Sequence, residues 1–250
     1  MTVKLEIPEE FARRLAPDDV SLARAALEAL AAEGVRSGQL TAFQARSLLG
    51  IESRMEMDGI LKAHGVFLDV TIRDVRKDSD VALAASMIVV VADSSPLNYL
   101  VLIGSVEVLK KLFNKILVPR EVIGELRAAA APSEVRTWAE ALPDWVTVSE
   151  AGAVENQEMS HLDPGERAAI RLAQIHPEAL LLIDDAAGRL EATLRGVQCT
   201  GTLGVLRAAA SKKLINLRPA LENLLTTNFR ISKSVIDDLL AEDDLRRHTE

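Results

Sequence analysis

Acidic residues end two apolar, strand-like runs of this sequence. Residues 88–92 are apolar and mostly β-branched, and they stop at Asp93. A second apolar run, residues 180–183, stops at Asp184 and Asp185. In a parallel α/β sheet the carboxyl ends of the strands share one edge, where ligands commonly bind. We therefore expect these acids at one sheet edge, with one of the adjacent pair capping a helix and the other facing the cleft.

Two further acids are predicted to lie on helices near that edge. Glu125 falls on the apolar face of its helix, and a carboxylate on such a face needs a partner. Glu166 stands three residues after Asp163 and completes a capping-box pattern. A helix cap explains Glu166 and Asp93 as well as a ligand role does, and the two roles are not exclusive.

Carboxylates gathered at one place repel one another unless a cation neutralises them. Oxygen ligands select hard divalent cations, so Mg²⁺ or Mn²⁺ is expected. Zinc is not indicated, because the chain has one cysteine, Cys199, and its four histidines stand at unrelated positions. Such ions assist phosphodiester hydrolysis, and the sequence shows no P-loop, dinucleotide fingerprint or hydrolase elbow that would favour other chemistry.

The elements that must position these acids follow an alternating pattern. Strands are predicted at residues 88–92, 116–118, 146–148, 180–183 and 198–200. Helices are predicted at residues 105–114, 119–129, 133–142, 164–175, 186–196, 202–213, 218–225 and 232–242. This alternation predicts an α/β fold in which a parallel central sheet is covered by helices on both faces.

The first 65 residues are predicted to be mainly helical. A capping-box pattern begins at Thr41, Gly50 supplies a turn, and a second helix follows, which is helix-turn-helix spacing. Arg54 and Lys62 lie on the exposed side of the second helix and are candidates for nucleic-acid binding. An α-hairpin that serves packing or dimerisation explains the spacing equally well.

The domain boundary is predicted near residues 77–80. Residues 66–80 indicate a strand or extended arm followed by a polar linker, so we expect one domain at 1–80 and a second at 81–250. Residues 3–7 alternate between apolar and polar types and predict a short edge or dimer strand.

The overall composition narrows the class of protein. The chain has 250 residues, of which 48% are hydrophobic and 26% charged, as in ordinary globular proteins. It lacks a secretory signal pattern and an apolar run long enough to span a bilayer, and its single cysteine fits a reducing compartment, so a cytoplasmic location without a membrane partner is expected. The net charge of −8 means that any nucleic-acid site is local or depends on metal ions.

Residues 88–225 resemble the PIN-domain nucleases. The resemblance is carried, in order, by VADSSPLNYL, LVPREVIGEL, LDPGERAAIRLA, LLLIDDAAGRLEA and GVQCTGTLGVLRAAASKKLI. It implies a three-layer α/β/α fold and a ribonuclease that uses Mg²⁺ or Mn²⁺ and belongs to bacterial and archaeal toxin–antitoxin pairs. The implied metal ligands are Asp93, Glu125, Glu166 and Asp184, with Asp185 as a competitor for the last place and with Ser94 and Thr200 around them.

Residues 3–75 are similar to small antitoxin-like helix-turn-helix proteins, through LEIPEEFARRL, ALEALAAEG and LTAFQARSLLGI. In that family the segment is usually a separate protein encoded beside a PIN toxin. A covalently attached antitoxin has a high effective concentration, so we expect self-inhibition. Arg73, Arg76 or Lys77 would then reach the acidic cleft, unless this segment is only a solvated connector.

The favoured hypothesis is a metal-dependent endoribonuclease fused to its DNA-binding, antitoxin-like module. RNA is the expected substrate, the chain's own promoter DNA is a further partner, and a homo-oligomer is expected. The candidate RNA contacts on the nuclease part are Arg189 and Lys212, and further candidates are Arg195, Arg207 and Lys213. The alternative is a transcriptional regulator whose PIN-like part serves only assembly, and a DNA flap-type nuclease is a third hypothesis.

Overall fold

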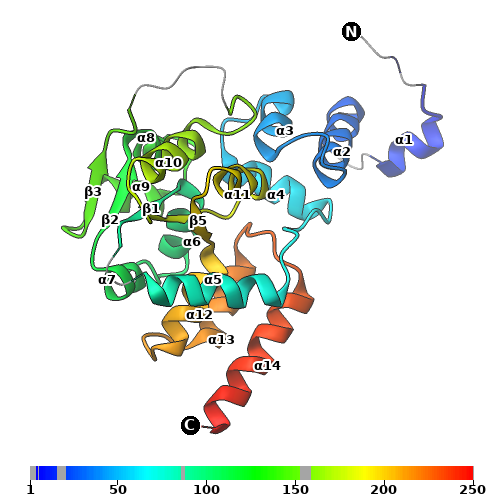
Figure 1. Cartoon of the computed structure of the whole chain (residues 1–250). Coiled ribbons are helices and arrows are strands. Elements are labelled where there is room, and N and C mark those ends of the chain that lie inside the picture. Colours follow the sequence, from blue (N-terminus) through cyan, green and yellow to red (C-terminus); the bar gives the residue numbers. More distant parts are fainter. Residues whose placement is uncertain (1–3, 5, 16–20, 86–87, 153–158, 250) are drawn as a thin grey trace. The chain divides into compact units, whose positions relative to one another are not determined.

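A computed structural model describes residues 4, 6–15, 21–85, 88–152 and 159–249 of the chain (Figure 1). The chain divides into two compact units, Met1–Val66 and Phe67–Glu250. Among the described residues, none of the helices combines the length and apolar character needed to cross a membrane.

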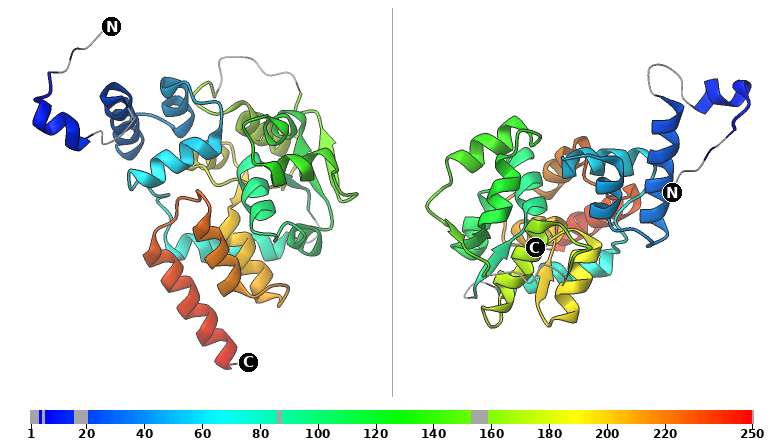
Figure 2. Two further views of the ribbon diagram at one scale, coloured as in Figure 1. Left: turned by 180° about the vertical axis from the view of Figure 1, so that it is seen from behind. Right: turned by 90° about the horizontal axis from the view of Figure 1, so that it is seen from above.

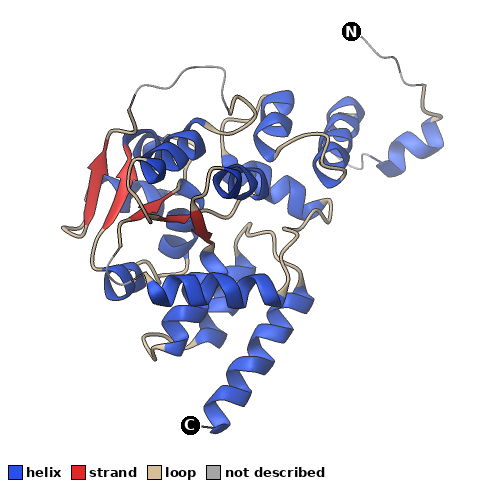
Figure 3. Ribbon diagram, in the orientation of Figure 1, coloured by secondary structure: helices blue, strands red, loops and turns tan. Residues whose placement is uncertain are grey.

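The larger unit is built on one parallel sheet of five short strands (Figure 3). Their order is β3-β2-β1-β4-β5, and every neighbouring pair is parallel. The strands are β1 (Val90–Ala92), β2 (Ile116–Pro119), β3 (Val146–Ser149), β4 (Leu180–Leu182) and β5 (Gln198–Thr200). The predicted α/β class with a parallel central sheet is therefore confirmed, and the five strands fall at the five predicted runs.

Helices lie on both faces of the sheet (Figures 1 and 2). Side chains of the central strands alternate between two apolar layers, as the period of two requires. Val90 and Leu182 point into the larger core, whereas Val91 and Leu181 point into the smaller one. The larger core is formed with α6 (Ser94–Leu102), α7 (Val108–Phe113), α8 (Arg120–Arg127), α9 (Ser133–Glu140), α12 (Thr202–Ser211), α13 (Leu217–Thr226) and α14 (Lys233–Thr249). The smaller core is formed with α10 (Pro164–Gln174) and α11 (Ala186–Leu194). The result is a three-layer α/β/α unit.

The segment before the first strand is a helix, α5 (Ile72–Ala84), and not the arm and polar linker that the sequence indicated. Thr71 caps it in a capping box with Asp74, and Val75 and Ala82 are buried in the larger core. Seven residues separate these two apolar positions, so they share one helical face. Most of the charged run is exposed, whereas Asp78 is buried. The helix packs along α12 and against β5. The predicted boundary near residues 77–80 thus falls inside a helix of the larger unit.

In the described part of the smaller unit the helices are α1 (Glu9–Leu15), α2 (Leu22–Arg36), α3 (Ala42–Leu49) and α4 (Arg54–Ala63). Its core includes Ala45, Leu49, Met57 and Leu61. The predicted capping box before α3 is present, and Gly50 ends that helix at φ 65°, in the left-handed region that glycine adopts without strain. The two helices predicted on either side of Gly50 are therefore present.

The short strand predicted at residues 3–7 is not seen where the structure describes this segment. Lys4, Glu6 and Ile7 are in irregular backbone, and the other residues of the segment lie outside the described part of the chain.

Candidate active site

Asp93 follows β1 directly and is fully buried. Its N–H donates to the carbonyl oxygen of Leu182 at 2.9 Å, so the ladder between β1 and β4 continues to this residue. Asp93 also stands at the N-cap position of α6, but in the described structure its side chain makes no capping hydrogen bond to that helix. Helix capping therefore does not explain the acid at this position.

Glu125 lies half-buried on α8 beside the N-terminus of α10. Its Oε1 accepts the N–H of Gly165 at 2.8 Å. Burial, a hydrogen bond with Asp163 and repulsion from Asp163 and Asp93 together raise the pKa of Glu125 well above its usual range, with Ser94 acting in the opposite direction. Glu125 is therefore protonated more readily than a solvent-exposed glutamate.

Gly165 leaves the space that Glu125 occupies. A Cβ at this position would lie 2.5 Å from Glu125 Oε1 and 2.7 Å from Oε2. Any larger residue would therefore displace the carboxylate from its place between Asp163 and the N-terminus of α10.

Glu166 closes a capping box with Asp163, as its spacing predicted. Its Oε2 accepts the N–H of Asp163 at 3.2 Å, and both side chains are buried. Glu166 thereby helps to position Asp163, the acid beside Glu125. Sequence reasoning treated Asp163 only as a cap, and the D-P-G-E pattern carried no signal that its carboxyl would meet a residue 38 positions earlier.

The two acids after β4 have different partners. Asp185 caps α11, because its Oδ1 accepts the N–H groups of Ala187 at 2.9 Å and Gly188 at 3.3 Å. Asp184 instead accepts two hydrogen bonds from Thr202, at 2.8 Å from its N–H and 2.6 Å from its hydroxyl. Asp185 is therefore the helix cap of this pair, and the ligand role expected for the other acid stays a prediction.

The hydroxyl beside Asp184 belongs to Thr202, whereas the sequence suggested Thr200. The Thr200 hydroxyl donates to the backbone oxygen of Asp78, at 3.0 Å. Both threonines are fully buried near the carboxyl end of β5. Ser94, the other residue suggested beside the acids, begins α6 and is buried.

Four of the predicted nucleic-acid contacts differ in burial and in their partners. The Arg189 guanidinium pairs with Asp78 at 2.8 Å, so it is engaged inside the larger unit. Lys212 is exposed at the end of α12. Arg54 and Lys62 are half-buried on α4, and burial lowers the pKa of Lys62.

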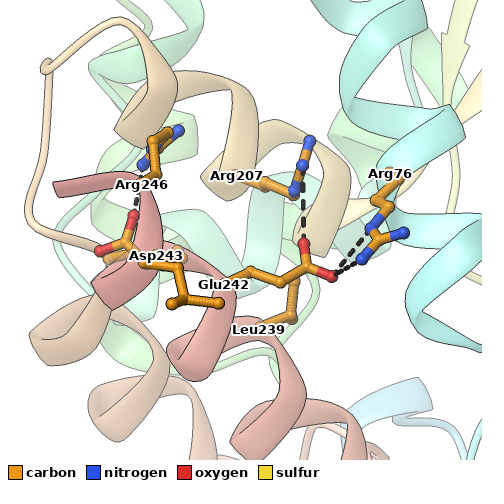
Figure 4. Close-up of a pocket in the computed structure, with 8 residues that line it drawn as sticks. Arg76, Arg207, Leu239, Glu242, Asp243 and Arg246 are labelled. Carbon is orange, nitrogen blue, oxygen red and sulfur yellow. Dashed lines mark hydrogen bonds and ion pairs between the residues drawn. The ribbon is translucent and has the colours of Figure 1, made fainter. Parts of the chain in front are cut away.

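The basic residues of α5 lie in different places. Arg76 pairs with Glu242 of α14, which also faces Arg207 of α12 at 3.6 Å (Figure 4). Lys77 lines a cavity of about 530 Å³ together with Asp184 and Arg189. Arg76 therefore ties α5 to the C-terminal helix, and Lys77 is the basic residue of this helix that shares a cavity with one of the predicted site acids.

A family model described as a PIN domain matches residues 89–244, more than half of the chain. The chain belongs to the PIN domain family. A second model, described as an uncharacterised protein family (UPF0175), matches residues 1–83 and bears out the similarity to antitoxin-like proteins. Searches of curated proteins and of solved structures returned no match. The predicted fusion of a PIN domain to an N-terminal antitoxin-like segment is thus confirmed.

PIN domains are generally nucleases and usually use divalent metal ions. The acids at the sheet edge of this PIN domain fit such an ion in donor chemistry, because they offer only oxygen ligands. Burial, with repulsion between these acids, raises the pKa of Glu125. Within the described ranges, however, no three Asp, Glu, His or Cys side chains are grouped closely enough to hold a metal ion. Glu125 lies beside Asp163 and within electrostatic reach of Asp93, whereas Asp184 is held by Thr202.

Proposed function

We propose that this protein is a metal-dependent endoribonuclease of PIN type, fused in one chain to an antitoxin-like module. The observation that carries the proposal is the cluster of Asp93, Glu125 and Asp163 at the carboxyl edge of the sheet. Buried carboxyl groups that face one another are costly without a neutralising cation. A site that keeps them there is suited to binding one.

The ligand roles go to Asp93, Glu125, Glu166 and Asp184, with Asp163 added as a neighbour of Glu125. A bound Mg²⁺ or Mn²⁺ would supply charge neutralisation and Lewis acidity for hydrolysis of a phosphodiester. The N–H of Gly165 fixes one oxygen of Glu125, and Thr202 fixes both oxygens of Asp184. These contacts orient the acids before any ion arrives, which limits the reorganisation that binding requires.

The test is cleavage of single-stranded RNA by the full chain with MnCl₂ or MgCl₂. Asp93→Asn should lower the rate at least about 100-fold, because it removes the charge of a buried predicted ligand. Asp144→Asn is the matched control, since this aspartate is exposed and lies outside the cluster. Equal rates for Asp93→Asn and wild type would exclude the proposed site. A flap-structured DNA substrate assayed in parallel distinguishes the flap-nuclease hypothesis.

The attached antitoxin-like module inhibits the nuclease in this proposal. The support is covalent linkage, which gives an attached segment an effective concentration on the order of millimolar for its own target. A chain that begins at Phe67 keeps the whole larger unit. It should cleave RNA at least about tenfold faster than the full chain. Equal rates would show that the module does not inhibit.

DNA binding by the smaller unit is a second candidate function, which the helix–turn–helix spacing of α3 and α4 favours. Binding to the chain's own promoter DNA should weaken in the double variant Arg54→Ala/Lys62→Ala. The slope of log affinity against log salt should fall by about two, one for each lost phosphate contact. Lys110→Ala, an exposed change in the other unit, is the control. Light scattering on the same samples tests the predicted homo-oligomer, and DNA binding without RNA cleavage would favour the regulator hypothesis.

A further inference from the structure

We propose that Asp78, on α5, is a positioning residue for Asp184 at the candidate metal site. Asp78 belongs to the segment matched by the antitoxin-like family, whereas Asp184 belongs to the PIN domain match. The inference rests on the proposed function for its link to metal binding. Its consequence is that the last helix of the antitoxin-like match completes the nuclease unit.

Asp78 makes three contacts across the larger unit. Its Oδ1 accepts from Arg189 Nη2 at 2.8 Å, and its Oδ2 accepts the N–H of Gly201 at 2.9 Å. Its backbone oxygen accepts from the Thr200 hydroxyl at 3.0 Å. One buried residue of α5 thereby holds both α11 and the end of β5.

Those partners border Asp184 on both sides. Arg189 also donates through Nη1 to the backbone oxygen of Ile183, the residue before Asp184, at 3.2 Å. Gly201 immediately precedes Thr202, whose N–H and hydroxyl bind Asp184. Asp78 therefore fixes the backbone before Asp184 through Arg189, and it fixes the hydrogen-bond donors of Asp184 through Gly201.

Two glycines make this close approach of α5 possible. A Cβ at Gly204 would lie 2.5 Å from the Cβ of Asp78 and 2.4 Å from the Thr200 hydroxyl. A Cβ at Gly201 would lie 2.7 Å from Asp184 Oδ1. The first turn of α12 is thus fitted to Asp78 on one side and to Asp184 on the other.

The burial of Arg189 explains why residue 78 is an acid. Arg189 is largely buried, and its guanidinium needs an anionic partner at that depth. Asp184 lines the same cavity and also attracts this cation electrostatically. Without Asp78, Arg189 would be freer to approach Asp184 and to compete with a metal ion for that carboxylate.

The decisive variant is Asp78→Asn, which keeps the shape and an oxygen for the Gly201 N–H but removes the charge that holds Arg189. The matched control is Asp80→Asn, an exposed aspartate on the same helix. Arg189→Lys is a second variant, which keeps the cation but loses the geometry that joins Asp78 to Ile183.

The first measurement is amide hydrogen exchange of Thr202 in the metal-free full chain. This amide reports the bond to Asp184 without any ion. Exchange should be faster by about tenfold or more in Asp78→Asn and Arg189→Lys, and unchanged in Asp80→Asn. If Asp78 contributed only to global stability, its substitution would leave the local opening at Thr202 as frequent as in wild type.

The second measurement is the affinity for Mn²⁺ by calorimetry. Loss of a residue that orients a ligand typically weakens metal binding about 10–100-fold, and we expect this range for Asp78→Asn. A folded Asp78→Asn or Arg189→Lys with wild-type exchange at Thr202 overturns the inference, as does an unchanged Mn²⁺ affinity. A wild-type protein that binds no Mn²⁺ refutes the proposed function instead, and the metal-free exchange still decides the role of Asp78.

Discussion

Gly165 shows how one missing side chain shapes the candidate site. Gly165→Ala should displace the Glu125 carboxylate, because the new Cβ would lie 2.5 Å from Oε1. Overpacking of this kind costs about 1–3 kcal/mol in the free energy of unfolding, and Mn²⁺ affinity should fall about tenfold or more. Thermal unfolding and calorimetry measure the two effects.

The matched control for that change is Gly124→Ala, next to Glu125 on the same helix. A Cβ there meets no atom within 4 Å. Alanine should leave Mn²⁺ affinity unchanged and stabilise the helix by about 0.5–1 kcal/mol. Equal Mn²⁺ affinities of the two glycine variants would show that the space beside Glu125 does not control metal binding.

The raised pKa of Glu125 makes stability depend on pH in a specific direction. Between the ordinary glutamate pKa and the raised one, the folded protein binds more protons than the unfolded chain. The free energy of unfolding therefore falls as the pH rises through the raised pKa. Glu125→Gln, which keeps an acceptor for Gly165, should remove this fall.

We expect Glu125→Gln to unfold at a higher temperature than wild type at about pH 8 in EDTA, and the difference to vanish toward about pH 4, where Glu125 is protonated in both states. Thermal unfolding followed by circular dichroism across this range is the measurement. Parallel pH profiles of the two proteins would mean that Glu125 titrates normally.

Helix α5 is the element whose role differs most from the sequence expectation. It places Val75, Ser79 and Ala82 in the buried interior of the larger unit. A chain that starts at Ala85 loses this layer and the Asp78 contacts, so we expect it to aggregate or to lack a cooperative unfolding transition. A chain that starts at Phe67 should unfold cooperatively.

Thermal unfolding of the two shortened chains, purified under the same conditions, checks this expectation. Cooperative unfolding of the chain from Ala85 at the temperature of the longer chain would show that α5 is an accessory. It would also mean that the PIN domain match, which begins at residue 89, is a complete folding unit.

The whole molecule consists of two compact units with separate cores, so we expect two transitions in calorimetry. Mn²⁺ should stabilise only the larger unit. Its free energy of unfolding should rise by about 2.7 kcal/mol when the free ion is 100-fold above its dissociation constant. EDTA should reverse the shift. A shift of the smaller unit's transition would place the metal site elsewhere.

Much of the fold was predictable because it depends on neighbours in the sequence. Strand runs, the capping boxes at Thr41 and Asp163, and the turn at Gly50 are set by hydrogen bonds that span a few residues. The position of Asp93 and Asp184 at one sheet edge followed from the rule that parallel strands share their carboxyl edge.

Tertiary structure decided which partner each acid takes. Asp163 meets Glu125, Asp184 bonds Thr202, and Asp78 reaches Arg189 across 111 residues, and no spacing in the sequence encodes such pairs. The sequence of α5 indicated a linker because charged and polar residues predominate in it. Its few apolar residues are recognised as a buried face only when α12 and β5 are seen packed against them. Local hydrogen bonding fixes the elements, whereas long-range packing fixes the charges that each buried carboxylate meets.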